Sequence, residues 1–181
     1  MKTICFITGN KNKLREATKI LDDYKIESIK IDLDELQGER SYVAERKAKL
    51  AAEQLNKTVI VDDTALCFNA LKGLPGIYIK HFLEKLGTIG LYNLVKDYDD
   101  KSADAVCSIG YCEPGKDPIV FEGICSGDIV GPKGKTDFGW DPIFMPKGQN
   151  KTYAELDNEI KNKISHRHKA LMKLKHFLES K

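Results

Sequence analysis

The N-terminal third of the chain alternates between two kinds of apolar pattern. Short runs of β-branched and aromatic residues are typical of buried strands, whereas apolar residues that recur every three or four positions are typical of helices. The predicted elements are a strand over 3–7, a helix that begins at residue 12, a strand over 25–33, a helix over 41–55 and a strand over 58–61 that ends at Asp62. Strands and helices therefore follow one another in turn.

The rest of the chain changes in character at a Gly-Leu-Pro-Gly turn. The elements predicted there are a turn over 73–76, a helix over 78–95, two antiparallel strands over 103–111 and 119–130, and a last helix over 157–179. This order of elements predicts an α/β protein with a mixed sheet.

Length and charge limit the number of domains and the kinds of binding partner that we expect. A chain of 181 residues has the size of one domain, so we expect residues 1–181 to fold as a single domain without a stabilising disulfide or metal. The 29 Lys and Arg residues against 27 Asp and Glu residues leave a net charge of +2, which argues against binding to a nucleic acid polymer. The longest stretch without these four residue types has ten residues, whereas a membrane-spanning helix needs about 20 apolar residues. We therefore expect no membrane partner.

The five cysteines are scattered along the chain and include no Cys-x-x-Cys pair. Most of them lie in apolar runs, which predicts buried free thiols in a reducing compartment. The apolar stretch near the N-terminus is also too short for a secretory signal. Both observations predict a cytoplasmic protein.

The first candidate site is the segment Thr8-Gly9-Asn10-Lys11-Asn12-Lys13, where the first strand leads into the first helix. Backbone amides and the positive end of a helix can bind phosphate at such a junction. Gly9 permits a tight turn, and the two lysines add positive charge. The segment matches neither the P-loop nor the GxGxxG pattern, so the alternative interpretation is a polar turn with two solvated lysines.

The second candidate site is Asp62-Asp63-Thr64, which follows a buried strand. Two adjacent carboxylates repel each other unless a positive group lies near them, and a divalent cation is one such partner. The alternative is a pair of acids that caps the next segment. A second acidic cluster contains Asp32, Asp34 and Glu35, and its alternative interpretation is a solvated loop.

Two further motifs lie in the C-terminal part of the chain. The segment Phe138-Gly139-Trp140-Asp141-Pro142 can present an aromatic face for stacking on a base, or it can form a hydrophobic plug beneath a turn. In the last predicted helix, Arg167 lies within an apolar stripe and His166 lies to one side of it. A guanidinium at such a position can read a base or can form a structural ion pair.

Together these signals describe a site for a nucleoside triphosphate. The chain resembles the inosine triphosphate pyrophosphatase family over essentially its whole length. The motifs that carry the resemblance are Thr8-Gly9-Asn10-x-x-Lys13-x-x-Glu16, Asp32-Leu33-x-Glu35-x-Gln37-Gly38-Glu39, Val61-Asp62-Asp63-Thr64, Gly73-Leu74-Pro75-Gly76-x-Tyr78-Ile79-Lys80, Phe138-Gly139-Trp140-Asp141-Pro142 and Ser165-His166-Arg167. Ala65 departs mildly from the family pattern, and so does the polar pair Lys11-Asn12.

The resemblance implies a fold and an activity. The implied fold is an elongated mixed β-sheet with flanking helices that form two lobes around a central nucleotide cleft, usually as a homodimer. The implied activity is the hydrolysis of ITP, dITP and XTP to a monophosphate and pyrophosphate, with Mg²⁺ as cofactor and Mn²⁺ as a possible substitute. The alternatives are a non-catalytic nucleotide sensor and a related pyrophosphatase that prefers standard or pyrimidine nucleotides.

The resemblance also implies roles for individual residues. The implied catalytic residues are Asp62, Asp63 and Lys13, and the implied metal ligands are Glu35 and Asp63. The residues implied to bind the substrate are Thr8, Gly9, Asn10, Lys11, Asn12, Lys13, Lys47, Asp63, Thr64, Lys80, Phe138, Gly139, Trp140, Asp141, Lys161, His166 and Arg167.

Overall fold

One mixed sheet of seven strands extends through the described part of this computed structural model, which is residues 1–135 and 139–181. The strands are β1 (Thr3–Ile7), β2 (Lys25–Ile29), β3 (Val59–Phe68), β4 (Pro75–Gly76), β5 (Ser102–Cys112), β6 (Ile119–Ile129) and β7 (Phe144–Pro146). The helices are α1 (Lys11–Ile20), α2 (Arg40–Leu55), α3 (Ile79–Asn93), α4 (Asn158–Ile164) and α5 (His166–Glu179). The α/β class predicted from the sequence is confirmed.

The strand order is β2-β1-β3-β5-β6-β7, and β4 pairs with β3 outside this path. β1 is parallel to both β2 and β3, while β4 and β7 are antiparallel to their neighbours β3 and β6. The sheet is therefore mixed. β5 and β6 are neighbours joined by the short connection 113–118, where the sequence predicts a hairpin.

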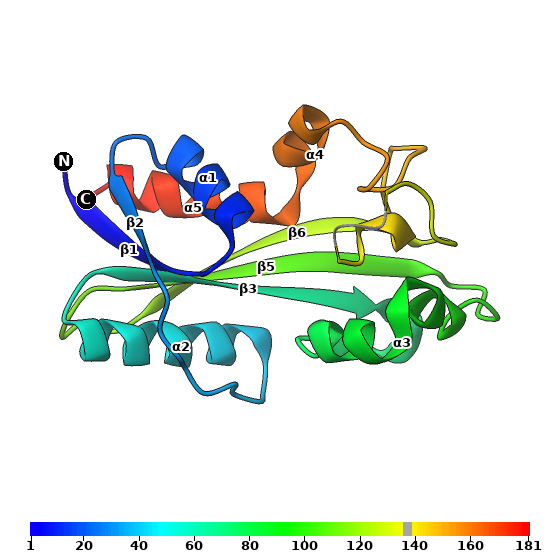
Figure 1. Cartoon of the computed structure of the whole chain (residues 1–181), viewed down its shortest axis with the longest axis horizontal. Coiled ribbons are helices and arrows are strands. Elements are labelled where there is room, and N and C mark those ends of the chain that lie inside the picture. The colour runs from blue at the N-terminus through cyan, green and yellow to red at the C-terminus, as the bar shows by residue number, and fades with distance from the viewer. Residues whose placement is uncertain (136–138) are drawn as a thin grey trace. The chain divides into compact units, whose positions relative to one another are not determined.

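The residues group into two compact units. The first unit contains residues 1–63, 107–123 and 167–181, and the second contains 64–106 and 124–166. In the first unit, α1 and α5 pack on one face of the strands and α2 packs on the other face (Figure 1). Each face has its own apolar cluster, and in the second unit the main cluster includes Trp140, Phe144 and Tyr153.

β3 is longer than the sequence predicts. The sequence predicts a strand over 58–61 that ends at Asp62. The strand instead continues through both aspartates to Phe68. The idea that the two aspartates cap a following segment is therefore wrong.

The last predicted helix is broken. Ser165 has extended backbone angles, φ −66° and ψ 153°, and it separates α4 from α5. The sequence predicts one apolar stripe that includes Ile160, Leu171, Leu174 and Leu178. Leu171, Leu174 and Leu178 of α5 are buried as predicted, whereas Ile160 of α4 is 42% exposed. The segment over 25–33 also ends early as a strand, at Ile29, and the three-residue β7 was not predicted.

Candidate functional site

Asp62 and Asp63 lie on opposite faces of β3, because successive side chains of a strand point to opposite faces. Ile60, two residues before Asp62, packs in the cluster with α1 and α5, whereas Val61, two residues before Asp63, packs in the cluster with α2. The ion pairs of the two aspartates follow the same division. Each carboxylate is therefore neutralised by its own cations, and a shared cation is not required to separate them.

Asp62 binds two cations on the face of α1 and α5. Its Oδ1 lies 2.8 Å from Lys13 Nζ, its Oδ2 lies 2.8 Å from Arg167 Nε, and its side chain is only 1% exposed. Burial raises the pKa of the Asp62 carboxyl, but the charges of Lys13 and Arg167 outweigh this effect and lower that pKa well below its ordinary value. Asp62 is therefore a buried permanent anion with both oxygens engaged.

Glu16 extends this cluster. It lies one helical turn after Lys13 on α1, and its Oε2 is 3.4 Å from Arg167 Nη1. Its other carboxylate oxygen, Oε1, is buried and has no hydrogen-bond partner among the described residues. Glu16 belongs to the first sequence motif, but the motif predicts no role for it. Its spacing of one helical turn from Lys13 is the sequence signal that places it beside the lysine.

Asp63 binds Lys47 of α2 on the opposite face. Lys47 Nζ lies 2.8 Å from Asp63 Oδ1 and 3.9 Å from Glu35 Oε2. Asp63 Oδ2 is buried and has no hydrogen-bond partner among the described residues. The structure thus brings Glu35, Lys47 and Asp63 together, whereas the sequence alone could not connect Lys47 with either acid.

The cluster of Glu35, Lys47 and Asp63 can be compared with the coordination that a divalent cation prefers. No group of three His, Cys, Asp or Glu side chains in the described residues could hold a metal ion. Magnesium, however, is usually held by one or two carboxylates together with phosphate oxygens and water. Glu35 and Asp63 supply two carboxylates that share one ammonium group, and Asp63 Oδ2 is an unsatisfied acceptor. These residues therefore fit magnesium.

The segment 8–13 forms the N-terminus of α1, as the sequence predicts. Asn10 caps the helix, because its Oδ1 accepts hydrogen bonds from the amides of Asn12 at 2.9 Å and Lys13 at 3.2 Å. Thr8 Oγ1 accepts from the Asn10 amide at 3.1 Å, and the Thr8 carbonyl accepts from Ser28 Oγ at 2.7 Å. The segment has a defined conformation in which two of the helix amides are already bonded to Asn10.

Several predicted site residues lie in the second unit. Lys161 Nζ is paired with Asp141 Oδ2, and His166 Nδ1 lies 3.4 Å from the Tyr153 hydroxyl. The Trp140 ring lies 5.6 Å from the His166 ring between centroids. Burial raises the pKa of the Tyr153 hydroxyl above its ordinary value. Tyr153 lies outside the sequence motifs, but its hydroxyl is within hydrogen-bonding distance of the predicted site residue His166.

The remaining predicted residues are placed as follows. Trp140 is only 8% exposed and packs in the main apolar cluster of the second unit, as the alternative of a hydrophobic plug predicts. Lys80 is exposed on α3, Thr64 is half-buried in β3, and Gly139 has φ +52°, a left-handed conformation that favours glycine. Phe138 lies outside the described residues. All five cysteines are buried and none is in a disulfide, which confirms the prediction of buried thiols.

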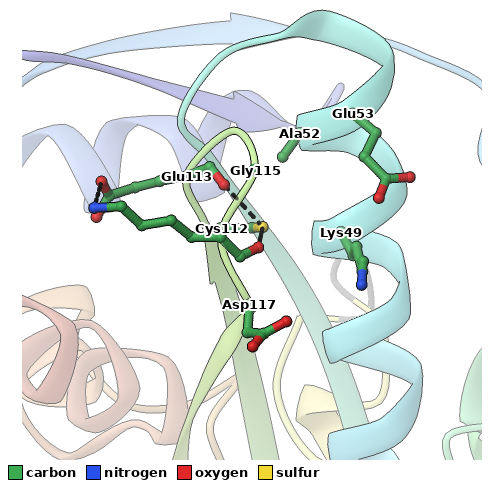
Figure 2. Close-up of a pocket in the computed structure, with 8 residues that line it drawn as sticks. Lys49, Ala52, Glu53, Cys112, Glu113, Gly115 and Asp117 are labelled. Carbon is green, nitrogen blue, oxygen red and sulfur yellow. Dashed lines mark hydrogen bonds and ion pairs between the residues drawn. The ribbon is translucent and has the colours of Figure 1, made fainter.

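A separate pocket of about 170 Å³ lies in the first unit. Figure 2 shows residues that line it. The pocket lies between α2 and the connection from β5 to β6, and its lining includes Lys49, Glu53 and Cys112. The Cys112 thiol donates to the carbonyls of Glu113 and Lys116, each at 3.4 Å. None of the described site residues named above lines this pocket, so it is not part of the candidate site.

Among the described residues, no helix is both long enough and apolar enough to span a membrane.

The chain is similar to known proteins over nearly its whole length. The model of the Ham1 family matches residues 4–177. The inosine triphosphate pyrophosphatase of Batrachochytrium dendrobatidis is 51% identical over 183 residues, which cover 100% of this chain and 96% of that protein. The inosine triphosphate pyrophosphatase of Pyricularia oryzae is 56% identical over 175 residues, which cover 96% of this chain and 92% of that protein.

Solved structures show the same fold. The Ham1 protein of Staphylococcus aureus has a TM-score of 0.86 and 35% identity, and the match covers 99% of each chain. The HAM1 protein of Coxiella burnetii has a TM-score of 0.90 and 31% identity, and the match covers 100% of each chain. The sequence comparisons and the structure comparisons therefore indicate the same family.

Proposed function

The chain belongs to the Ham1 family, and from this premise we propose that it hydrolyses deaminated purine nucleoside triphosphates to a monophosphate and pyrophosphate. The proposed substrates are ITP, dITP and XTP. The observation that carries the proposal is the arrangement around β3, where two adjacent carboxylates each hold a lysine. Paired lysines and carboxylates are suited to binding a polyanion together with a cation.

The phosphates would be bound by Lys13, Lys47 and the N-terminus of α1. An ammonium group acts as a point charge, which suits a phosphate whose oxygens can rotate. Asn10 holds two amides of this helix end in place, and Thr8 fixes Asn10 in turn. Gly9, Lys11 and Asn12 complete the segment that we assign to the phosphates.

Glu35 and Asp63 would hold magnesium, with manganese as a possible substitute. When bound there, the ion would supply positive charge near the phosphates and make a coordinated water more acidic. Asp63 Oδ2, the carboxylate oxygen without a hydrogen-bond partner among the described residues, supports this assignment.

The proposed reaction is attack of water on the α-phosphorus. A bond forms between the water oxygen and the α-phosphorus, the bond from that phosphorus to the bridging oxygen breaks, and pyrophosphate departs. Asp63 is the acid that we assign to orient the water and accept its proton, because its Oδ1 is released when Lys47 binds the phosphates, whereas both Asp62 oxygens are engaged by cations. Lys13 stabilises negative charge on the departing pyrophosphate, and Asp62 holds Lys13 in place.

The base and sugar are assigned to residues that the family resemblance implies. We propose this role for Lys80, Phe138, Trp140, Asp141, Lys161, His166 and Arg167, and we assign Thr64 and Gly139 to substrate binding in general. The pairs Asp141–Lys161 and Tyr153–His166 fix four of the side chains in this region. The homodimer, the nucleotide cleft between two lobes, the single-domain organisation and the cytoplasmic location also stay predictions.

Product analysis with ITP, ATP and dTTP tests the proposed activity. With magnesium present, we expect pyrophosphate release from ITP to be much faster than release from the other two nucleotides. In ¹⁸O-labelled water, the label is expected in the monophosphate. Intact ITP after long incubation would instead support a nucleotide sensor, and preferred cleavage of dTTP or ATP would support a related pyrophosphatase.

The metal assignment has its own test. Glu35→Gln and Asp63→Asn are expected to fold normally, to lose most turnover and to need more magnesium, because the lost electrostatic stabilisation is worth several kcal/mol. Full activity in both variants at unchanged magnesium would contradict the assignment.

A further inference from the structure

Lys47 lies where the two proposed metal ligands meet. Its Nζ is 2.8 Å from Asp63 Oδ1 and 3.9 Å from Glu35 Oε2. The Lys47 side chain is 15% exposed, whereas Glu35 is 79% exposed. Lys47 therefore supplies, from inside the fold, the positive charge that the two carboxylates would otherwise take from an ion.

The pairing leaves one carboxylate oxygen unsatisfied. Asp63 Oδ2 is buried and has no hydrogen-bond partner among the described residues. A divalent cation that binds this oxygen would lie only a few ångströms from the Lys47 ammonium, since both would be attached to one carboxylate. Like charges at this separation repel each other even near the surface of a protein. The ammonium and the metal ion therefore compete for the same pair of carboxylates.

We propose that Lys47 is the counter-ion of the metal-free site, and that a divalent cation displaces it from Glu35 and Asp63 toward the phosphates of the nucleotide. This inference rests on the metal site of the proposed function. It gives Lys47 two successive partners, the carboxylates before the metal binds and the phosphates afterwards. A long and flexible side chain with three N–H donors can make both sets of contacts.

The exchange links the two binding events. Phosphates that attract Lys47 remove a positive charge from the metal site, so they raise the affinity for the metal. By thermodynamic reciprocity, the metal raises the affinity for the phosphates by the same factor. Without Lys47, this part of the coupling is lost.

Binding of Mn²⁺ to the nucleotide-free protein tests the proposal, with free Mn²⁺ measured by electron paramagnetic resonance. Lys47→Met removes the competing charge, and its Kd for Mn²⁺ is expected to fall about tenfold or more. Lys49→Met is the matched control, because Lys49 is on the same helix but lines the separate pocket. It is expected to keep the wild-type Kd, and so is Lys47→Arg, which keeps the charge.

The thermal midpoint gives a second readout. Lys47→Met leaves Asp63 without its cation and is expected to be less stable than the wild type. Added Mn²⁺ is expected to raise its midpoint more than it raises that of the wild type, because the ion replaces the lost charge.

The outcomes separate the two proposals. An unchanged or higher Kd in Lys47→Met, with normal binding in the wild type, would overturn the counter-ion role and leave the proposed function intact. Absence of Mn²⁺ binding in every variant would overturn both the counter-ion role and the metal assignment. Tighter binding in Lys47→Met that is lost again when Asp63→Asn is added would support both.

Discussion

At the scale of single residues, the structure separates two acids that the sequence presents as a pair. Asp62 is buried between Lys13 and Arg167, whereas Asp63 is bound to Lys47 and keeps one oxygen without a partner among the described residues. The same residue type at adjacent positions therefore has two different surroundings. We expect the two aspartates to respond differently to the same substitution.

Asp62→Asn is expected to be strongly destabilising. The substitution leaves Lys13 and Arg167 buried without their anion, and removal of one partner of a buried ion pair costs about 3–5 kcal/mol. Urea unfolding followed by circular dichroism measures this loss. Asp63→Asn is the matched control and is expected to lose less stability, because its side chain is 23% exposed and its ion pair has a single short contact. Equal losses in the two variants would contradict this division of roles.

We predict that Arg167 contributes to the preference for ITP over ATP. Hypoxanthine and xanthine have an acceptor oxygen at position 6, whereas adenine has an amino donor there, and arginine can only donate. Asp62 and Glu16 engage Nε and Nη1 of Arg167 and so orient its guanidinium plane. Arg167→Leu is expected to lower kcat/KM for ITP by about tenfold to a few hundredfold and to change the low ATP value little.

GTP provides the internal comparison for Arg167→Leu. Guanine also has the oxygen at position 6, so the ITP/GTP ratio is expected to fall much less than the ITP/ATP ratio. Steady-state kinetics with all three nucleotides measures both ratios. An unchanged preference for ITP over ATP would contradict this prediction and would show that Arg167 has a structural role only, in its ion pairs with Asp62 and Glu16.

At the scale of elements, α2 packs very closely on β5. A Cβ atom at Gly110 would lie 2.4 Å from the Ala44 carbonyl oxygen and 2.9 Å from Val61 Cγ2. Because α2 also carries Lys47, the absence of a side chain at Gly110 helps set the position of the lysine opposite Asp63.

Gly110→Ala is expected to push α2 away from the sheet. Overpacking of this kind costs about 1–3 kcal/mol, and each kcal/mol lowers the thermal midpoint by about 2–4 °C in a chain of this size. Turnover is expected to fall as well, because the contact of Lys47 with Asp63 is disturbed. Gly131→Ala is the control, since a Cβ atom there meets nothing within 4 Å, and it is expected to change neither quantity.

The elements also show which structural features the sequence pattern can predict and which it cannot. The segment 8–13 and the first strand were predictable, because a strand that ends at glycine before a helical pattern is a local signal. The length of β3 was not, because it depends on cations from α1, α2 and α5 that neutralise its aspartates. One of them, Arg167, is 105 positions away from Asp62 along the chain. The break at Ser165 was also missed, because apolar spacing continues across it.

At the scale of the whole molecule, three strands contribute residues to both compact units. The division between the units falls after Asp63 in β3, after Val106 in β5 and after Gly123 in β6. A strand that is continuous across this division cannot lose its pairing in one unit without loosening its end in the other. This continuity favours cooperative unfolding of the two units.

The cysteines provide a test, because they are distributed over both units. Cys5, Cys107 and Cys112 belong to the first unit, and Cys67 and Cys125 belong to the second. Burial raises the pKa of the Cys5, Cys107 and Cys112 thiols, so at pH 8 little of the reactive thiolate is present, and this fraction grows as the pH rises. We expect slow reaction of the native protein with Ellman's reagent.

In increasing urea, all five thiols are expected to become reactive in one transition that coincides with the loss of circular dichroism. The sole tryptophan, Trp140, lies in the second unit and follows the same transition by fluorescence. Two separate transitions, with two thiols released apart from the other three, would instead show that the units unfold independently.

The alternation along β3 ties the surroundings of its two aspartates to the number of residues in the strand. Deletion of one residue between Val59 and Asp62 would reverse the faces of the residues on one side of the gap relative to the other side. If the apolar residues kept their places, Asp62 would face α2 and Asp63 would face α1 and α5. In the gene segment that encodes β3, an in-frame loss or gain of a single codon should therefore exchange the partners of both acids at once.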